Sequence, residues 1–310
     1  MVELLLRGSG MVEPLGLAEA LDRSNIHVLS GTQTAQYRND DPGDDFTLDA
    51  RTWIGRWSTA ADPDSMISIG KGGSASAPVV VGGSVIGDVP WDATWGTVKD
   101  RWDAAGIRIE GSNAQAYLDG RIKNMEDGYQ MFPVSEPNGN TTDMFLAQGV
   151  YMEHIRDDAF ENDQVMPGSI VDCYIEGTNV FLSEQASSQD IVNPSAVVHV
   201  RGCLVHMIEM PNENADGGTG YGQVFKWQGS GAGTVVVTDS LFLLDSYPIR
   251  DNHWPSGSYA RNTVILGPHY RGGTGYLPSA GVRVTTDMNV WRSRVTAWLA
   301  THPPVPEAGG

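Results

Sequence analysis

The sequence predicts an all-β solenoid of parallel strands, because of its composition, its glycine distribution and an internal repeat. The chain has 310 residues, of which 40% are hydrophobic and 19% are charged, so it has enough apolar material for a folded core. Its 37 glycines are spread along the chain between short β-branched segments, as turn residues are, and are not pooled in a linker. A sequence pattern also recurs. It consists of a small residue, a short run of alternating apolar positions, an Asn, Asp or Gly, and a second apolar pair.

The recurring pattern gives the number of residues in each expected coil of the solenoid. Its segments are 78–89, 114–132, 147–163, 168–184, 195–210, 234–246 and 260–267. We take as equivalent positions Ile86, Ile122, Tyr151, Tyr174, Leu204, Leu241 and Val264, which lie 36, 29, 23, 30, 37 and 23 residues apart. The shortest step suits one coil of a solenoid, and the longer steps leave room for loops. We therefore expect a single domain over 1–310, with an N-terminal cap region at 1–30, repeat coils at 75–285 and a C-terminal cap and tail at 286–310.

Three of the segments align more finely and carry a resemblance. A polar, a small and an aromatic residue recur in order in Asp127-Gly128-Tyr129, Asp158-Ala159-Phe160 and Asn179-Val180-Phe181. In a parallel solenoid such equivalents stack about 4.8 Å apart. The repeat pattern resembles the right-handed parallel β-helix of the pectin-lyase-like superfamily, which includes polysaccharide lyases, glycoside hydrolases and phage tailspikes. The IRDDAFEND segment at 155–163, with VFLSE at 180–184, is similar to secreted bacterial β-helix repeat proteins of mostly unassigned function. The resemblance is specific for the fold and not for an activity.

Three further segments predict short helices. Segments 14–22 and 289–301 lie near the two ends, where we expect them to cover the open strand edges of the solenoid. Segment 90–102 places Trp91, Trp95, Val98 and Trp102 at i, i+4, i+7 and i+11. We expect it to form an insertion on the side of the solenoid, with this apolar stripe facing the core.

Charge and motifs exclude several classes of function. The net charge of −18 and the pI of about 4.6 disfavour nucleic acid and anionic membranes as partners, and no apolar stretch is long enough for membrane insertion. In the first ten residues, MVELLLRGSG, the apolar run is too short for the hydrophobic core of a signal peptide. We therefore expect that the chain is either not exported or is a mature or trimmed form. The resemblance implies a secreted or cell-surface protein. The sequence has no HExxH, GxSxG or Walker A motif, and it leaves the oligomeric state open.

The densest group of acids lies at 156–163, and the preceding coil adds Glu126 and Asp127 at equivalent positions. Stacked carboxylates repel, so one of them must take a proton, bind a cation or meet a basic side chain. A protonated acid beside an ionised one suits a glycoside hydrolase, and a carboxylate cage suits Ca²⁺. The resemblance implies, for a lyase, that Ca²⁺ neutralises a uronate while Arg or Lys removes a proton. The structural alternative is that these acids only cap turns.

From this group we expect the catalytic residues Asp127, Arg156, Asp157, Asp158 and Glu161. Lys123 is expected to be a basic partner that contacts substrate, and Asp163 a cation ligand. Arg121-Ile122-Lys123 and Asp157-Asp158 resemble the RIK and DD motifs of polygalacturonases, but their order is reversed and the NTD and GHG motifs are missing, so that mechanism is not carried over.

Three other groups of residues are candidates for binding or structure. Asn212, Asn214 and Asp216 have the spacing of a weak Ca²⁺ loop, although an ordinary Gly/Asn-rich loop explains them better. Cys173 and Cys203 occupy matching positions and are expected to be stacked, buried free thiols, with a disulfide as the alternative. Two loops combine basic and aromatic residues suited to an anionic glycan, or are ordinary surface turns: Arg250, His253, Trp254, His269, Tyr270 and Arg271.

Together these features favour a carbohydrate-active β-helix protein that binds a polysaccharide along one solenoid face and cleaves it as a lyase or glycoside hydrolase, with Ca²⁺ as a candidate cofactor. The alternative is a non-catalytic glycan-binding β-helix of the surface, adhesin or tailspike type, since this fold hosts both.

Overall fold

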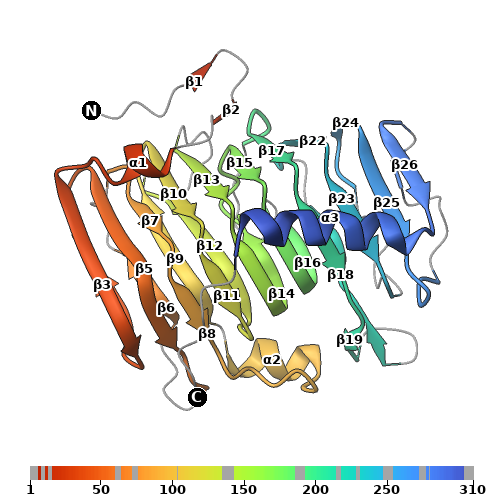
Figure 1. Ribbon diagram of the computed structural model, residues 1–310, viewed down its shortest axis with the longest axis horizontal. Coiled ribbons are helices and arrows are strands. Elements are labelled where there is room, and N and C mark those ends of the chain that lie inside the picture. The colour runs from red at the N-terminus through yellow and green to blue at the C-terminus, as the bar shows by residue number, and fades with distance from the viewer. Residues whose placement is uncertain are drawn as a thin grey trace.

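The computed structural model describes the chain as a solenoid of parallel strands (Figure 1). The described residues are 6–7, 11–12, 16–59, 64–71, 76–102, 104–134, 143–185, 193–213, 218–227, 231–246, 254–271, 277–278 and 280–303. Within them, a 22-stranded sheet winds so that successive coils stack in parallel register. The predicted all-β parallel β-helix with short helices is therefore confirmed.

The wound sheet has three faces, which we call sheets A, B and C. Sheet A contains β7 (Val79–Val81), β10 (Ala114–Leu118), β13 (Met144–Gln148), β15 (Gly168–Val171), β17 (Val197–Arg201), β22 (Thr234–Thr238) and β24 (Gly257–Ala260). Sheet B contains β8 (Ser84–Ile86), β11 (Arg121–Lys123), the first halves of β14 (Tyr151–Glu161) and β16 (Tyr174–Glu184), β18 (Leu204–Met207), β23 (Leu241–Leu244), β25 (Asn262–Leu266) and β26 (Val282–Thr285). Sheet C contains β4 (Tyr37–Asn39), β6 (Ser65–Ile69), β9 (Ala105–Gly111), β12 (Asp127–Pro133), the second halves of β14 and β16, and β21 (Gln223–Trp227).

The long strands β3 (Asn25–Gln33) and β5 (Phe46–Arg56) run through both sheet A and sheet B at the N-terminal end. The parallel strands thus begin at Asn25, well before the range of 75–285 that the repeat pattern predicted. Two small antiparallel pairs complete the strands: β1 (Leu6–Arg7) with β2 (Met11–Val12), and β19 (Met210–Pro211) with β20 (Thr219–Gly220).

The corner between sheets A and B explains the Gly, Asp and Asn residues of the repeat. The residue that follows the sheet A strand has a positive φ, a conformation that Gly adopts freely and Asp and Asn tolerate. These corner residues, with φ between 52° and 69°, are Gly82, Asp119, Gly149, Asp172, Gly202, Asp239 and Arg261.

The helices lie on the outside of the coils. α1 (Leu17–Ala20) packs Ala20 against apolar side chains on the outer face of sheet A. α2 (Trp95–Arg101) starts at the N-cap Thr94 and contacts β14. α3 (Met288–Thr301) crosses the outer face of sheet B, where Trp291 and Trp298 pack on Tyr174, Leu204 and Leu241 (Figure 1).

Among the described helices, α1 and α3 pack on the sides of the coils and not across the ends, where the sequence led us to expect them. α3 runs back along the side of the coils, and Arg121 donates hydrogen bonds to the carbonyl oxygens of His302 and Pro303 at its end. Among the described residues, β3 pairs only with β5, and Val28 is 68% exposed. The reason is that the apolar residues of these helices match outward-facing apolar patches on sheets A and B, which need burial more than the strand edges do.

Candidate functional site

The outer face of sheet C carries an uninterrupted row of polar residues. The strand partners Arg38, Ser68, Arg108, Gln130, Glu161, Ser183 and Lys226 follow one another in register through successive coils; we call them the polar row. The preceding residues, which include Ile67, Ile107, Tyr129 and Phe160, lie in the core. Because side chains alternate along a strand, the polar row faces outward.

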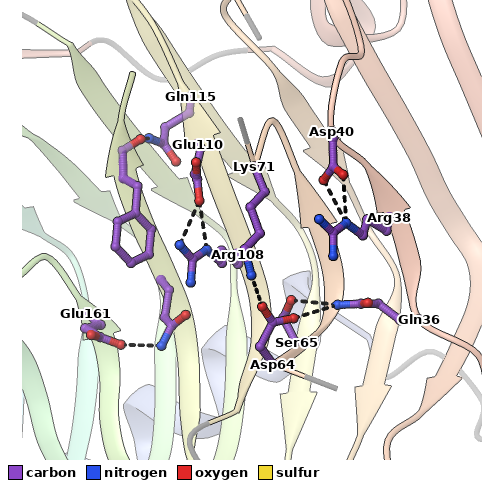
Figure 2. A network of polar contacts seen from close by, with 12 residues as sticks. Gln36, Arg38, Asp40, Asp64, Ser65, Lys71, Arg108, Glu110, Gln115 and Glu161 are labelled. Carbon is purple, nitrogen blue, oxygen red and sulfur yellow. Dashed lines mark hydrogen bonds and ion pairs between the residues drawn. The ribbon is translucent and has the colours of Figure 1, made fainter. Parts of the chain in front are cut away.

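Charged pairs line this face (Figure 2). Arg108 donates to Oε1 of Glu110 at 2.7 and 3.0 Å, and Arg38 donates to both oxygens of Asp40. The side chain of Arg38 is 48% exposed, that of Arg108 is 22% exposed and that of Lys226 is 12% exposed. Three other members of the row alternate with these and are less accessible, since Ser68, Gln130 and Ser183 are buried. The Arg108 guanidinium also lies 4.1 Å from the ring centre of Phe132.

A buried group of acids lies where sheet B bends into sheet C. The strand β14 changes register between Ile155 and Asp158, and this bend brings Asp157 and Asp158 beside Asp127 of the preceding coil. Each of the three acids offers a carboxylate oxygen within 4.8 Å of the others; we call them the acid cluster. All three side chains are buried: Asp127 and Asp157 are 4% exposed, and Asp158 is 2% exposed.

Neighbouring side chains hold the acid cluster in place. The backbone N–H of Asp158 donates to Oδ1 of Asp127 at 2.9 Å, and Gln130 donates to Oδ2 of Asp127 at 3.2 Å. Asp157 Oδ1 accepts from the indole N–H of Trp95 at 3.1 Å and from Asn179 at 3.4 Å. The helical spacing of Trp95 led us to expect that its side chain faces the core. The structure shows instead that its indole N–H connects α2 to the acid cluster.

Lys226 is the basic partner of the cluster, with Nζ 3.1 Å from Oδ2 of Asp158. Burial alone would lower the pKa of Lys226, but Asp158, Asp157 and Asp163 raise it, so the ammonium group stays charged. Sequence reasoning missed this residue. The signal was a single lysine within the apolar segment QVFKW, which a strand can accommodate only if the charge is paired.

The carboxyl groups of Asp127, Asp158 and Glu161 hold protons more tightly than usual. Burial, together with the neighbouring acids, raises the pKa of Asp127 well above its ordinary range. Burial also raises the pKa of Asp158 well above its ordinary range, although the charge of Lys226 acts to lower it. Burial and then Asp163 raise the pKa of Glu161 to about 7. Glu161 is partly exposed and accepts a 2.6 Å hydrogen bond from Gln130. It is thus the predicted catalytic acid that an outside molecule can reach.

The remaining predicted basic residues lie elsewhere. Arg156 is 1% exposed, stacks 5.2 Å from the ring centre of Trp91 and donates to the carbonyl oxygen of Ala93; burial lowers its pKa to about 10. Lys123 pairs with Glu153 at 3.0 Å on the outer face of sheet B. Neither forms an ion pair with Asp127 or Asp158 among the described contacts.

The other predicted binding residues do not gather into one site. Trp254 packs between Phe225 and Phe242, with ring centres 5.4 and 5.0 Å away, and Tyr270 also packs on the core. These aromatic rings close the interior of the last coils, where burial outweighs exposure to a ligand. The backbone N–H of His269 contacts Asp245, and Arg271 is exposed. Arg250 and His253 lie outside the described residues.

The residues of the two predicted cation sites also lie in different parts of the structure. Asp163 borders the acid cluster and accepts hydrogen bonds from Ser183 and Gln185, both at 2.8 Å. Asn212 is buried next to the β19–β20 pair, and Asn214 and Asp216 lie outside the described residues. The thiols of Cys173 and Cys203 are buried and free, as predicted.

Comparisons with protein families, with curated proteins and with solved structures found no match to this chain. In the part of the chain that the structure describes, no helix has the length and apolar character needed to cross a membrane.

Proposed function

We propose that this protein is a carbohydrate-active parallel β-helix that binds a polysaccharide along the polar row and cleaves it beside Glu161. The observation that carries the proposal is the row itself, with one polar side chain per coil on an outer face. A polymer laid along the solenoid axis meets the accessible members of the row, Arg38, Arg108, Glu161 and Lys226, at multiples of the coil spacing of about 4.8 Å. α1 and α3 pack on sheets A and B, so among the described helices neither occupies this face.

The chemistry of the row suits sugars. Arg108 presents a planar array of donors, Glu110 and Gln130 present acceptors, and Phe132 adds an apolar surface on the same face. Glu161 lies partly exposed in the row, where a carboxyl group can transfer a proton to a glycosidic oxygen or take one from a sugar carbon. The buried Asp127, Asp157 and Asp158 are out of reach of a polymer and are assigned a different role below.

A panel of neutral and uronate-containing polysaccharides tests the proposal. Binding is measured by affinity electrophoresis, hydrolysis by new reducing ends and elimination by the ultraviolet absorbance of an unsaturated product. We expect R108A to weaken binding about tenfold, as loss of charge-assisted hydrogen bonds does. We expect E161Q to bind like wild type and to release no product. R261A, which removes an exposed arginine paired with Asp239, is the matched control.

A second function, glycan binding without cleavage, is favoured by the pairing of the other acids on this face. Glu110 is engaged by Arg108, and Asp163 by Ser183 and Gln185. The carboxyl group that contacts Glu161 is that of Asp127, which is only 4% exposed and so is out of reach of a polymer. Binding that depends on Arg108 without any product would establish this alternative. Binding unaffected by R108A, or absent for the whole panel, would contradict both functions.

A further inference from the structure

We propose that Asp127, Asp157, Asp158 and Asn179 bind one Ca²⁺ ion that fixes α2 and three successive coils to one another. This role is structural and does not depend on the proposed glycan function. The residues come from β12, β14 and β16, and Trp95 of α2 contacts the same group.

The first observation is the convergence of oxygen atoms. Three carboxylates, each at least 96% buried, have oxygens within 4.8 Å of one another. Ca²⁺ is bound by several carboxylate and amide oxygens at about 2.3 to 2.6 Å, so an ion between these groups requires only small side-chain movements. The group contains no His or Cys, and an all-oxygen set suits Ca²⁺ better than Zn²⁺.

The second observation is that two buried oxygens in this group lack hydrogen-bond partners in the described part of the chain. They are Oδ1 of Asp158 and Oδ1 of Asn179. The amide of Asn179 is 3% exposed and its nitrogen lies 3.4 Å from Asp157, so rotation of this amide by half a turn would direct Oδ1 at the cluster. Buried polar atoms are nearly always satisfied, and a cation would satisfy both of these.

The charge of the cluster also calls for a cation. Three carboxylates face the single ammonium group of Lys226, which pairs with only one oxygen of Asp158. Buried Glu126 adds to the negative charge, and Arg156 has a Coulombic interaction with Asp157. A divalent ion balances the two carboxylate charges that Lys226 leaves.

The burial of the site defines what the ion does. Because the ligands are at most 4% exposed, the ion would not contact a polymer on the outer face. It would instead join the strands of three coils and, through Asp157, the indole of Trp95. An ion that binds only the folded state stabilises it by mass action, so the site should appear as a Ca²⁺-dependent gain in thermal stability.

Terbium luminescence tests this site in the full chain. The indole nitrogen of Trp95 lies 3.1 Å from Oδ1 of Asp157, so excitation of tryptophan should sensitise Tb³⁺ bound there. After chelator treatment, we expect one Tb³⁺ per chain with strong sensitised emission, displacement by Ca²⁺ but not by equal Mg²⁺, and a higher Tm with Ca²⁺. W95F should reduce the sensitised emission and leave Tb³⁺ stoichiometry, measured by direct excitation, unchanged.

Variants locate the ion. D157N should abolish high-affinity Ca²⁺ binding measured by calorimetry, and N179A, which keeps the net charge, should weaken it about tenfold as expected for one lost ligand. D100N, which neutralises an exposed acid on α2, is the control and should bind like wild type. Circular dichroism establishes that each variant is folded. Wild-type protein that binds no ion, or N179A and W95F that both behave like wild type in every readout, would overturn the proposal.

Discussion

Lys226 and Asp158 form a buried ion pair between coils, with 3.1 Å between Nζ and Oδ2 and with side chains only 12% and 3% exposed. Burial of both charges is costly unless each is satisfied, and removal of one partner leaves the other uncompensated. The pair therefore contributes more to the free energy of unfolding than an exposed ion pair with a similar distance.

Replacement of Lys226 by Met tests this relationship. We expect the free energy of unfolding, measured by urea titration without Ca²⁺, to fall by about 3 kcal/mol. The control is K123M, whose partly exposed pair with Glu153 at 3.0 Å should contribute less than about 1 kcal/mol. Equal losses in the two variants would contradict the role of the buried pair.

The same substitution makes a prediction about Ca²⁺. Lys226 is the cation that now balances the acid cluster, so its removal should strengthen Ca²⁺ binding and enlarge the Ca²⁺-dependent increase in Tm. Calorimetry and thermal melts of K226M with and without Ca²⁺ measure both quantities. Unchanged Ca²⁺ affinity would show that the ammonium and the ion do not share the same carboxylates.

His206 predicts a pH dependence of stability on the other side of the molecule. Its Nδ1 lies 3.2 Å from Glu176 and its Nε2 lies 3.9 Å from Asp245, while Trp291 of α3 packs against the ring. Burial lowers the pKa of His206, but the two carboxylates outweigh it and raise the pKa above its ordinary value. The stabilisation is therefore complete below the unfolded-state pKa of about 6.5 and is lost as pH rises through the folded-state pKa.

H206Q should remove this pH-dependent contribution. We expect the difference in unfolding free energy between wild type and H206Q to be largest near pH 6 and to shrink toward pH 8, following the one-proton linkage. Denaturant titrations at a series of pH values measure it, with the same substitution at exposed His27 as the control. A difference that does not change with pH would mean that His206 contributes only packing.

The sequence predicted the fold because its turns are local. The Gly or Asp at six of the seven corners between sheets A and B, such as Gly149 and Asp172, can be identified from residue type, since few other residues accept the positive φ; Arg261 at the last corner cannot. The site was predicted less completely. The acids from Asp127 to Asp163 stand out as a cluster, but Lys226 enters it only through the stacking of a later coil.

The strand register shows which of the equivalent positions predicted from the sequence repeat are correct. Tyr151, Tyr174, Leu204 and Leu241 are true equivalents, as predicted. Ile86, Ile122 and Val264 are not, because they pair with Lys123, Met152 and Phe242. Similarly, Tyr129 pairs with Phe160 as predicted, but Phe160 pairs with Leu182 and not with Phe181. Sheet B has apolar residues on both faces, so hydrophobicity did not distinguish the inward row from the outward one.

The outward apolar row of sheet B needs α3 as its cover, and this gives the last prediction. Trp298 is 5% exposed, packs on Tyr174 and donates from its indole to the carbonyl oxygen of Asp172 at 3.0 Å. W298A should lower the free energy of unfolding by about 3 kcal/mol, as large-to-small changes in cores do. It should also make α3 more sensitive to limited proteolysis than the coils.

The neighbouring Leu299 is the matched control for α3 docking, because it is 37% exposed. L299A should change the unfolding free energy by less than about 0.5 kcal/mol. Cleavage of W298A within α3, with the coils still folded by circular dichroism, would establish the helix as a separately detachable cover. If W298A and wild type are cleaved at the same rate, the row of Tyr174, Leu204 and Leu241 is held by something other than Trp298, and its apolar character is not explained by α3.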